Sequence, residues 1–213
     1  MPDTTKMQTQ IIFGTPLTVF QNAYHASDTE IDFILDLPRK SYDGGVQMTD
    51  DTHILIAPEL AAIKDIIDEK AAIFRTDVLG ISNEIKMVHS WSTVITKDKA
   101  HRAHNHKGAL FAVVLYLRVP EGSGNLVLRE ERCALDKGLD LDYNITNHNS
   151  FNCKITGVEV VEGMVAMFPA WVRHGTMSST TDKLRITIGA NFFVAGKVGK
   201  NNIATSVSVG DWE

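Results

Sequence analysis

The spacing of apolar residues along the chain changes near position 85. Before that point apolar residues recur at every third or fourth position, most clearly at Ile63, Ile67 and Phe74. This spacing predicts a helix over 58–80, because it begins with a proline, which suits a first helical turn, and ends with a glycine, which terminates helices. A shorter helix is predicted over 29–37, with a serine or aspartate as its cap and a proline after it.

After position 85 the period of the pattern falls to two, which is typical of strands. Strands are expected at 85–95, with the chain reaching a further strand end at 100–106, and at 109–118, 125–129, 154–161, 164–169 and 184–193. The polar stretches 41–57 and 133–152 are expected to be loops. Short strands that follow N-terminal helices predict a mainly β fold, an antiparallel barrel or sandwich with the helices on one side.

The last expected strand has two chemically different faces. Arg185, Thr187 and Asn191 alternate with Ile186 and Ile188, so the polar and aliphatic side chains lie on opposite faces. Two interpretations stay open at this point. The polar face points to water, as on a surface strand, or it points into a polar barrel mouth while the aliphatic face packs under the helices.

Length and composition favour one globular domain. The chain has 213 residues, of which 44% are hydrophobic and 22% charged, and a chain of this length can bury one sizeable core. We expect a single domain over 1–213, with an N-terminal helical support region at 1–84, a β core at 85–195 and a C-terminal tail at 196–213.

Charge and hydropathy exclude several classes of function. The net charge of −5 argues against nucleic acid or an anionic membrane as the main partner. No apolar stretch is long enough to span a bilayer, and the first residues lack a secretory signal. The chain has two cysteines, Cys133 and Cys153, too few for a disulfide scaffold, so both are expected to be free thiols. We therefore expect a soluble cytoplasmic protein. Its oligomeric state cannot be read from the sequence.

Three histidines have the spacing of metal ligands. His104 and His106 stand at an expected strand end, where residues two apart share a face and His101 points the other way. His174 lies far downstream, at the end of an apolar segment that runs from 163 to 174. Two imidazoles from one strand and one from another would cap a single ion and leave the remaining positions of an octahedral metal open, as O2 chemistry requires.

A turn after His174 is expected to bring the next strand back alongside, and Arg185 stands at the start of that strand. Arg185 is therefore expected at the same end of the barrel as His174. Its guanidinium can hold a carboxylate in a bidentate, charge-assisted contact. Thr187 lies on the same face and can donate its hydroxyl to that carboxylate. A metal and a carboxylate clamp at a fixed separation suit a 2-oxo diacid, whose 2-oxo acid end would chelate the metal.

At this point the sequence resembles the Fe(II)/2-oxoglutarate-dependent oxygenases with a double-stranded β-helix core. The residues that carry the resemblance are His104-Asn-His106, His174 and the strand from Arg185 to Asn191. Within that superfamily the chain is similar to small bacterial and phage oxygenases related to prolyl hydroxylases. The resemblance implies a jelly-roll or cupin-like core and a dioxygenase that uses Fe(II), 2-oxoglutarate and O2 to hydroxylate an unactivated C–H bond. By the same resemblance, the substrate is a protein or peptide side chain, with peptidyl proline the first choice.

The chain departs from the superfamily at one ligand. The usual motif has a carboxylate where His106 stands, and three interpretations stay open: His106 is the third ligand, a carboxylate such as Glu130 replaces it, or the protein supplies only two ligands. The resemblance also implies that the Tyr116 hydroxyl bonds to 2-oxoglutarate. Long loops near barrel mouths often act as lids, so the 133–152 loop is a candidate for substrate selection, and Trp171 for a wall of the substrate pocket.

Two other functions remain compatible with the sequence. One is a cupin-type three-histidine metal dioxygenase that needs no cosubstrate, for which a carboxylate clamp such as Arg185 would have no purpose. The other is a non-catalytic jelly-roll protein, either a binding module or a phage structural protein, whose histidines would hold zinc or nothing.

Overall fold

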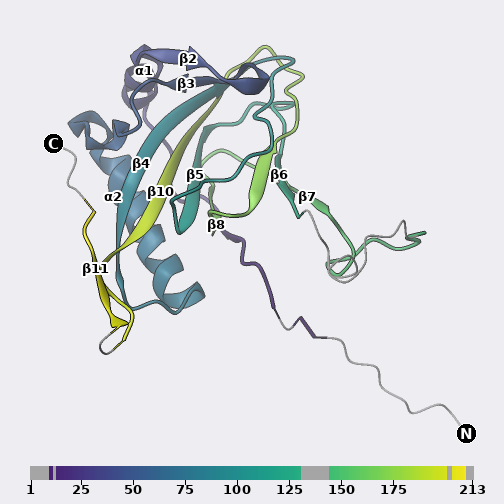
Figure 1. Cartoon of the computed structure of the whole chain (residues 1–213). Coiled ribbons are helices and arrows are strands. Elements are labelled where there is room, and N and C mark those ends of the chain that lie inside the picture. The colour runs from purple at the N-terminus through teal and green to yellow at the C-terminus, as the bar shows by residue number, and fades with distance from the viewer. Residues whose placement is uncertain (1–9, 12, 131–143, 201–202, 210–213) are drawn as a thin grey trace, which may run out of the picture.

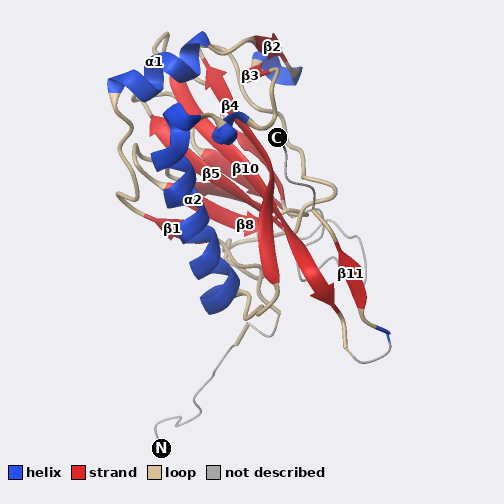
Figure 2. Ribbon diagram, turned by 90° about the vertical axis from the view of Figure 1, so that its left-hand side faces the viewer, coloured by secondary structure: helices blue, strands red, loops and turns tan. Residues whose placement is uncertain are grey.

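Two β-sheets face each other, and helices cover the outer face of the larger one. The computed structural model describes residues 10–11, 13–130, 144–200 and 203–209. Figure 1 shows the layers edge-on, with α1 and α2 on one side of the large sheet and β6 and β7 on the other. Figure 2 shows both helices lying across the strands of the large sheet. The described chain is thus mainly β with N-terminal helices on one side, as the sequence predicts.

The large sheet has the strand order β1-β8-β5-β10-β4-β3-β2, and β11 pairs with the far end of β10. All of its pairs are antiparallel. Its members are β1 (Thr18–Phe20), β2 (Arg39–Ser41), β3 (Gln47–Thr49), β4 (Glu84–Ile95), β5 (Phe111–Arg118), β8 (Val165–Pro169), β10 (Arg185–Val198) and β11 (Thr205–Val207). The central strand β10 lies between β4 and β5.

The small sheet has the order β7-β6-β9, again antiparallel. It consists of β6 (Leu126–Arg129), β7 (Ile155–Val158) and β9 (Arg173–Thr176). Its inner face meets the large sheet across a second apolar cluster, which includes Tyr116, Leu126 and Phe168. The space between the two sheets therefore has an apolar lining at one end.

The predicted helices form, and their ends follow local chemistry. Helix α1 spans Asp28–Asp36 and begins with a capping box between Ser27 and Glu30. The predicted 58–80 helix is instead divided into a 3-10 turn at Pro58–Leu60, helix α2 at Ala61–Ile73 and a π-helical turn at Phe74–Val78. Two further 3-10 turns lie at Asp43–Gly45 and Ile54–Ile56.

The main core lies between α2 and the large sheet. Ile63, Ile67 and Phe74 are fully buried there against residues of β5 and β10 such as Phe111 and Ile188. The opposite face of β10, with Arg185 and Thr187, turns towards the small sheet and is buried as well. The structure thus selects the second interpretation of this strand, because α2 covers the aliphatic face and forces the polar face into the barrel.

Several strands lie where the sequence pattern predicted none. Strand β3 lies in the stretch 41–57 that was expected to be a loop, and β2 ends at the first residue of that stretch. His174 lies on a separate strand, β9, and β11 lies in the expected tail. These strands are three or four residues long, too short for alternation to be recognised. Conversely, the expected strand end at 100–106 is an irregular segment that forms an isolated bridge between His104 and His174.

The structure bears on the expectations about membrane spans and cysteines for the described residues. No helix of the described residues is long and apolar enough to cross a membrane. Cys153 is a free thiol, whereas Cys133 and most of the 133–152 loop lie outside the described residues. The single-domain organisation and the cytoplasmic location stay predictions.

Candidate metal centre and carboxylate clamp

The histidine-bearing segment 101–106 lies along β9 as an added, irregular strand. His104 and His174 exchange backbone hydrogen bonds in both directions, each with an N···O distance of 2.9 Å. The amide of Thr176 donates to the carbonyl of His101 at 2.9 Å. Because these bonds tie the segment to β9, the imidazoles of two distant parts of the sequence face each other across one ladder.

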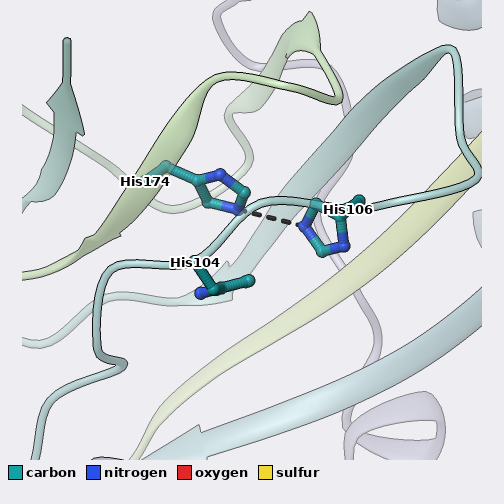
Figure 3. Close-up of side chains that lie close together, drawn as sticks. All are labelled: His104, His106 and His174. Carbon is teal, nitrogen blue, oxygen red and sulfur yellow. Dashed lines mark hydrogen bonds between the residues drawn. The ribbon is translucent and has the colours of Figure 1, made fainter. Parts of the chain in front are cut away.

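The structure brings the three predicted histidines together. The ligand-capable nitrogens of His104, His106 and His174 all lie within 4.8 Å of one another, which is the spacing of groups that share one metal ion. Figure 3 shows the three rings converging, with the Nε2 atoms of His106 and His174 joined at 3.1 Å. The residues that cluster are thus the three histidines that the sequence spacing proposed as ligands.

Backbone carbonyls hold two of these rings in the tautomer that a metal requires. The Nδ1–H of His104 donates to the carbonyl of Arg102 at 2.8 Å, and the Nδ1–H of His174 donates to the carbonyl of Val172 at 2.9 Å. Because a carbonyl can only accept, both Nδ1 atoms carry the proton, and both Nε2 atoms keep a lone pair for an ion.

The cluster is also held in the neutral, ligand-competent form. Burial, followed by the neighbouring imidazoles, lowers the pKa of His106 to about 3 and that of His174 to about 4. Burial lowers the pKa of His104 as well. At neutral pH none of the three rings carries a charge that would repel a cation.

A fourth imidazole, that of His101, lies against the cluster, which corrects the expectation that it points away. Its ring centroid is 4.2 Å from that of His104. Burial, then His104, His174 and Arg185, lower the pKa of His101 to about 3. The expectation was wrong because the alternation of faces holds only in an extended strand, and this segment is irregular.

The guanidinium of Arg185 is buried without a carboxylate partner among the described residues. Its side chain is 2% exposed, and its Nη1 donates to the carbonyls of Gly124 at 2.8 Å and Ser123 at 3.5 Å. Its Nε is buried and has no hydrogen-bond partner. A buried charge that is not neutralised is costly, so this position fits an anionic ligand.

Two further predicted residues, Tyr116 and Thr187, lie beside Arg185. The guanidinium carbon is 5.2 Å from the centre of the Tyr116 ring, and the Tyr116 hydroxyl is buried with no hydrogen-bond partner. Burial raises the pKa of Tyr116 to about 12, so the hydroxyl is a neutral donor. Thr187 pairs with Tyr116 across the strands, and its hydroxyl bonds to that of Thr93 at 2.6 Å.

Glu130, the alternative third ligand, lies outside the histidine cluster. It is exposed, it follows the end of β6, and its amide donates to the carbonyl of Lys154 at 2.8 Å. It lines a second groove, and Trp171 lines the same groove. Trp171 is 58% exposed there and does not border the pocket at the histidines.

A pocket of about 420 Å³ opens onto the histidine cluster. Its lining comes from β4, the 101–106 segment, the region around β2 and β3, and one residue of β10. The lining residues are Tyr42, Asp43, Met48, Thr52, His89, Trp91, His101, Arg102, Ala103, His104, His106 and Asn191. Asp43 and Arg102 form an ion pair at 3.0 Å. The pocket therefore combines an aromatic wall with a neutralised charge pair.

Two residues touch the cluster to which sequence reasoning assigned no contact with the histidines. The Trp91 ring packs on His106 with 5.4 Å between centroids, and Asn191 contacts the Nδ1 of His106 at 3.4 Å. The register of β10 places Asn191 on the same face as Arg185, as alternation along the sequence predicts. Contact with His106 depends on the path of the 101–106 segment, which no local pattern predicts.

One family of known proteins matches the part of the chain that carries the site. Residues 89–191 match the family model described as "Putative 2OG-Fe(II) oxygenase", and this range contains all three clustered histidines and Arg185. A search of curated proteins finds no match. The match confirms the resemblance of the core of the chain to the Fe(II)/2-oxoglutarate-dependent oxygenase superfamily, whose enzymes are oxidoreductases that use Fe(II), 2-oxoglutarate and O2.

Solved structures confirm the double-stranded β-helix fold. An oxidoreductase of the 2OG-Fe(II) oxygenase family from Burkholderia pseudomallei is 14% identical, with a TM-score of 0.58 and 83% of each chain covered. HygX from Streptomyces hygroscopicus, with nickel and 2-oxoglutarate bound, is 14% identical, with a TM-score of 0.57 over 84% of this chain and 82% of that one. A prolyl-4-hydroxylase from Pseudomonas putida is 14% identical, with a TM-score of 0.54 over 85% of this chain and 94% of that one.

Proposed function

We propose that this oxygenase-like chain is an Fe(II)- and 2-oxoglutarate-dependent dioxygenase that oxidises a C–H bond. His104, His106 and His174 hold the iron, and Arg185 binds the far carboxylate of 2-oxoglutarate. The observation that carries the proposal is a buried guanidinium without a carboxylate partner among the described residues, in the barrel that also holds three converging imidazoles. A cupin-type dioxygenase without a cosubstrate has no use for this cation.

The donor set fits iron that must keep open positions. Three neutral imidazoles suit Fe(II), and three protein ligands leave the other octahedral positions for the cosubstrate and O2. Three neutral imidazoles add no negative charge to the site. The net charge of the metal with its protein ligands is therefore more positive than with the usual two histidines and one carboxylate. The anionic 2-oxo acid end of the cosubstrate compensates this charge, so metal and cosubstrate are expected to bind with positive coupling.

When bound, Fe(II) with 2-oxoglutarate and O2 supplies the oxidising power: one oxygen atom goes to succinate as CO2 is released, and the other goes to the substrate C–H bond, which becomes C–OH. The protein's share is binding, orientation and exclusion of water. Arg185 fixes the far end of 2-oxoglutarate by a bidentate contact. Tyr116 donates its neutral hydroxyl to the same molecule, and Thr187, oriented by Thr93, donates a second hydroxyl.

The pocket at the histidines is where the substrate binds. Trp91, Tyr42 and Met48 give it apolar walls, and the pair of Asp43 and Arg102 leaves no net charge from these two groups at its rim. A neutral aliphatic group fits such a lining. The prolyl side chain of a protein or peptide, the substrate implied by the sequence resemblance, is of this class and is the first to test.

An anaerobic titration tests the proposal directly. Fe(II) followed by 2-oxoglutarate should give the visible absorption band that a metal-chelated 2-oxo acid produces, and admitting O2 should release succinate. Arg185→Ala should lose the band at cosubstrate concentrations that saturate the wild type, while it still binds the metal. Arg129→Ala, an exposed arginine on β6, is the matched control and should behave like the wild type.

Succinate release should rise when the right substrate is present, so a panel of prolyl peptides and other neutral aliphatic compounds follows. Absence of both the band and succinate from the wild type, across the panel, would refute the assignment as a 2-oxoglutarate enzyme. A band that survives Arg185→Ala would refute the clamp and leave the metal centre standing.

A further inference from the structure

Asn191 is nearly enclosed, and one end of its amide has no hydrogen-bond partner. The residue is 7% exposed, on the interior face of β10. Its Nδ2 lies 3.4 Å from Nδ1 of His106, and its buried Oδ1 bonds to nothing. A buried amide oxygen without a partner is costly, and such groups in native proteins usually have a functional reason.

The hydrogen bonds around Asn191 determine where each proton lies when no metal is bound. The Nδ1 of His174 donates to the carbonyl of Val172, so a neutral His174 has only a lone pair on Nε2. That lone pair lies 3.1 Å from Nε2 of His106, which must therefore be the donor. A neutral His106 then has a lone pair on Nδ1, which accepts the amide N–H of Asn191.

Metal binding reverses this arrangement at His106. Its Nε2 must present a lone pair to the ion, so the single ring proton moves to Nδ1. Nδ1–H would then face the N–H of Asn191, donor against donor. A half-turn of the amide about its terminal bond replaces Nδ2 by Oδ1, which accepts the proton at the same place.

We propose that Asn191 is a positioning residue that holds His106 in its ligand tautomer by turning its amide oxygen towards Nδ1. The inference rests on the proposed function insofar as it needs His106 to bind a metal. In this proposal Asn191, which is not itself a ligand, determines whether His106 can bind the metal. Its amide can hydrogen-bond to either tautomer of His106. An amide can do this because it has a donor and an acceptor of nearly equal size.

Substitutions at Asn191 separate this role from simple packing. Asn191→Leu keeps the shape and removes both hydrogen-bonding ends, so the Kd for Co(II) or Zn(II) should rise by about 10–100-fold, the usual loss when a ligand's outer partner is removed. Asn191→Asp can only accept, so it should bind the metal at least as tightly as the wild type. Asn83 directly precedes β4, and its Nδ2 donates to the carbonyl of Lys197 at 2.8 Å. Asn83→Leu and Asn83→Asp are the matched controls and should leave Kd unchanged.

The dependence on His106 provides a second readout. In a His106→Ala background, Asn191→Leu should cause no further loss of metal affinity, because the partner it orients is absent. Imidazole ¹⁵N NMR of the wild type should show His106 protonated at Nε2 without metal and at Nδ1 with Zn(II).

The possible results are distinguishable. An unchanged Kd in Asn191→Leu, equal losses in Asn191→Leu and Asn191→Asp, or the same His106 tautomer with and without Zn(II) would each overturn the role of Asn191 while the metal site stands. A wild-type protein that binds none of these ions would overturn the metal site and this inference together.

Discussion

A Cβ added to Gly175 would lie 2.6 Å from the carbonyl oxygen of His101. The same added atom would come within 3.2 Å of backbone atoms of Arg102 and Ala103. The 101–106 segment therefore lies flat on β9 only because position 175 has no side chain, and that contact places His104 opposite His174.

Gly175→Ala should weaken metal binding although it removes no ligand. Backbone cannot move aside as a flexible side chain does, and forced overpacking costs about 1–3 kcal/mol. If the segment lifts, His104 loses its position, and the Kd for Co(II) should rise on the order of tenfold. Calorimetric titration of the folded variant measures this. Gly157→Ala, on β7 at the other edge of the same sheet, with nothing within 4 Å of an added Cβ, should bind like the wild type. Equal affinities for all three proteins would contradict the prediction.

The third ligand can be identified by two substitutions. His106→Ala should lose most Fe(II) binding, because His106 is one of the three clustered imidazoles. Glu130→Ala should retain it, since Glu130 is exposed and belongs neither to the cluster of three imidazoles nor to the pocket lining. Iron retained after gel filtration under anaerobic conditions gives the comparison. Loss of iron in Glu130→Ala with retention in His106→Ala would show that Glu130 is the third ligand.

The carboxylate clamp predicts ligand-dependent thermal stability. With Zn(II) in place of iron, 2-oxoglutarate at about 100 times its Kd should stabilise the wild type by roughly 2.7 kcal/mol, seen as a raised Tm. Arg185→Lys should lose most of this rise, because an ammonium cannot make the bidentate contact. Arg129→Lys should keep it. An equal shift in Arg185→Lys would mean that the far carboxylate binds elsewhere.

Acid should destabilise the metal-free protein through the histidine cluster. The folded pKa of both His101 and His106 is about 3, below the ordinary value of 6.5 that applies to the unfolded chain. Below pH 6.5 the unfolded chain binds protons that the folded protein does not, so the free energy of unfolding falls as pH drops towards 3. Urea unfolding at several pH values measures this slope.

The double variant His101→Gln, His106→Gln should have a shallower dependence on pH between 6.5 and 4 than the wild type. Identical slopes in the wild type and the double variant would show that the cluster does not bind protons differently in the two states.

The core between α2 and the large sheet should be independent of the metal chemistry. Ile67→Ala removes a fully buried side chain and should cost about 2–5 kcal/mol of stability. Ile56→Ala, at a position 57% exposed, should cost far less. Both variants should bind Co(II) with wild-type affinity while folded. A loss of affinity in Ile67→Ala would show that the helical layer and the histidine cluster are coupled.

The sequence was sufficient to predict the two faces of the long strand β10 and the residue types that can bind a metal and an anion. The alternation along β10 predicted its two faces, and the residue types of His104, His106, His174 and Arg185 predicted a metal centre beside a carboxylate clamp. The clustering of the three imidazoles and the burial of Arg185 agree with that prediction. These features could be predicted because a long strand repeats its pattern often enough to show its direction.

The contacts made by short or irregular segments could not be predicted from a repeating pattern. The ring of His101 packs against that of His104, and the amide of Asn191 contacts Nδ1 of His106. Residues around β2 and β3 line the pocket. Each of these contacts joins residues that lie far apart in the sequence or in a segment without a period. The sequence by itself determined which groups could bind a metal and an anion. Only the tertiary structure decided which side chains surround and orient them, because those contacts depend on how distant backbones pack together.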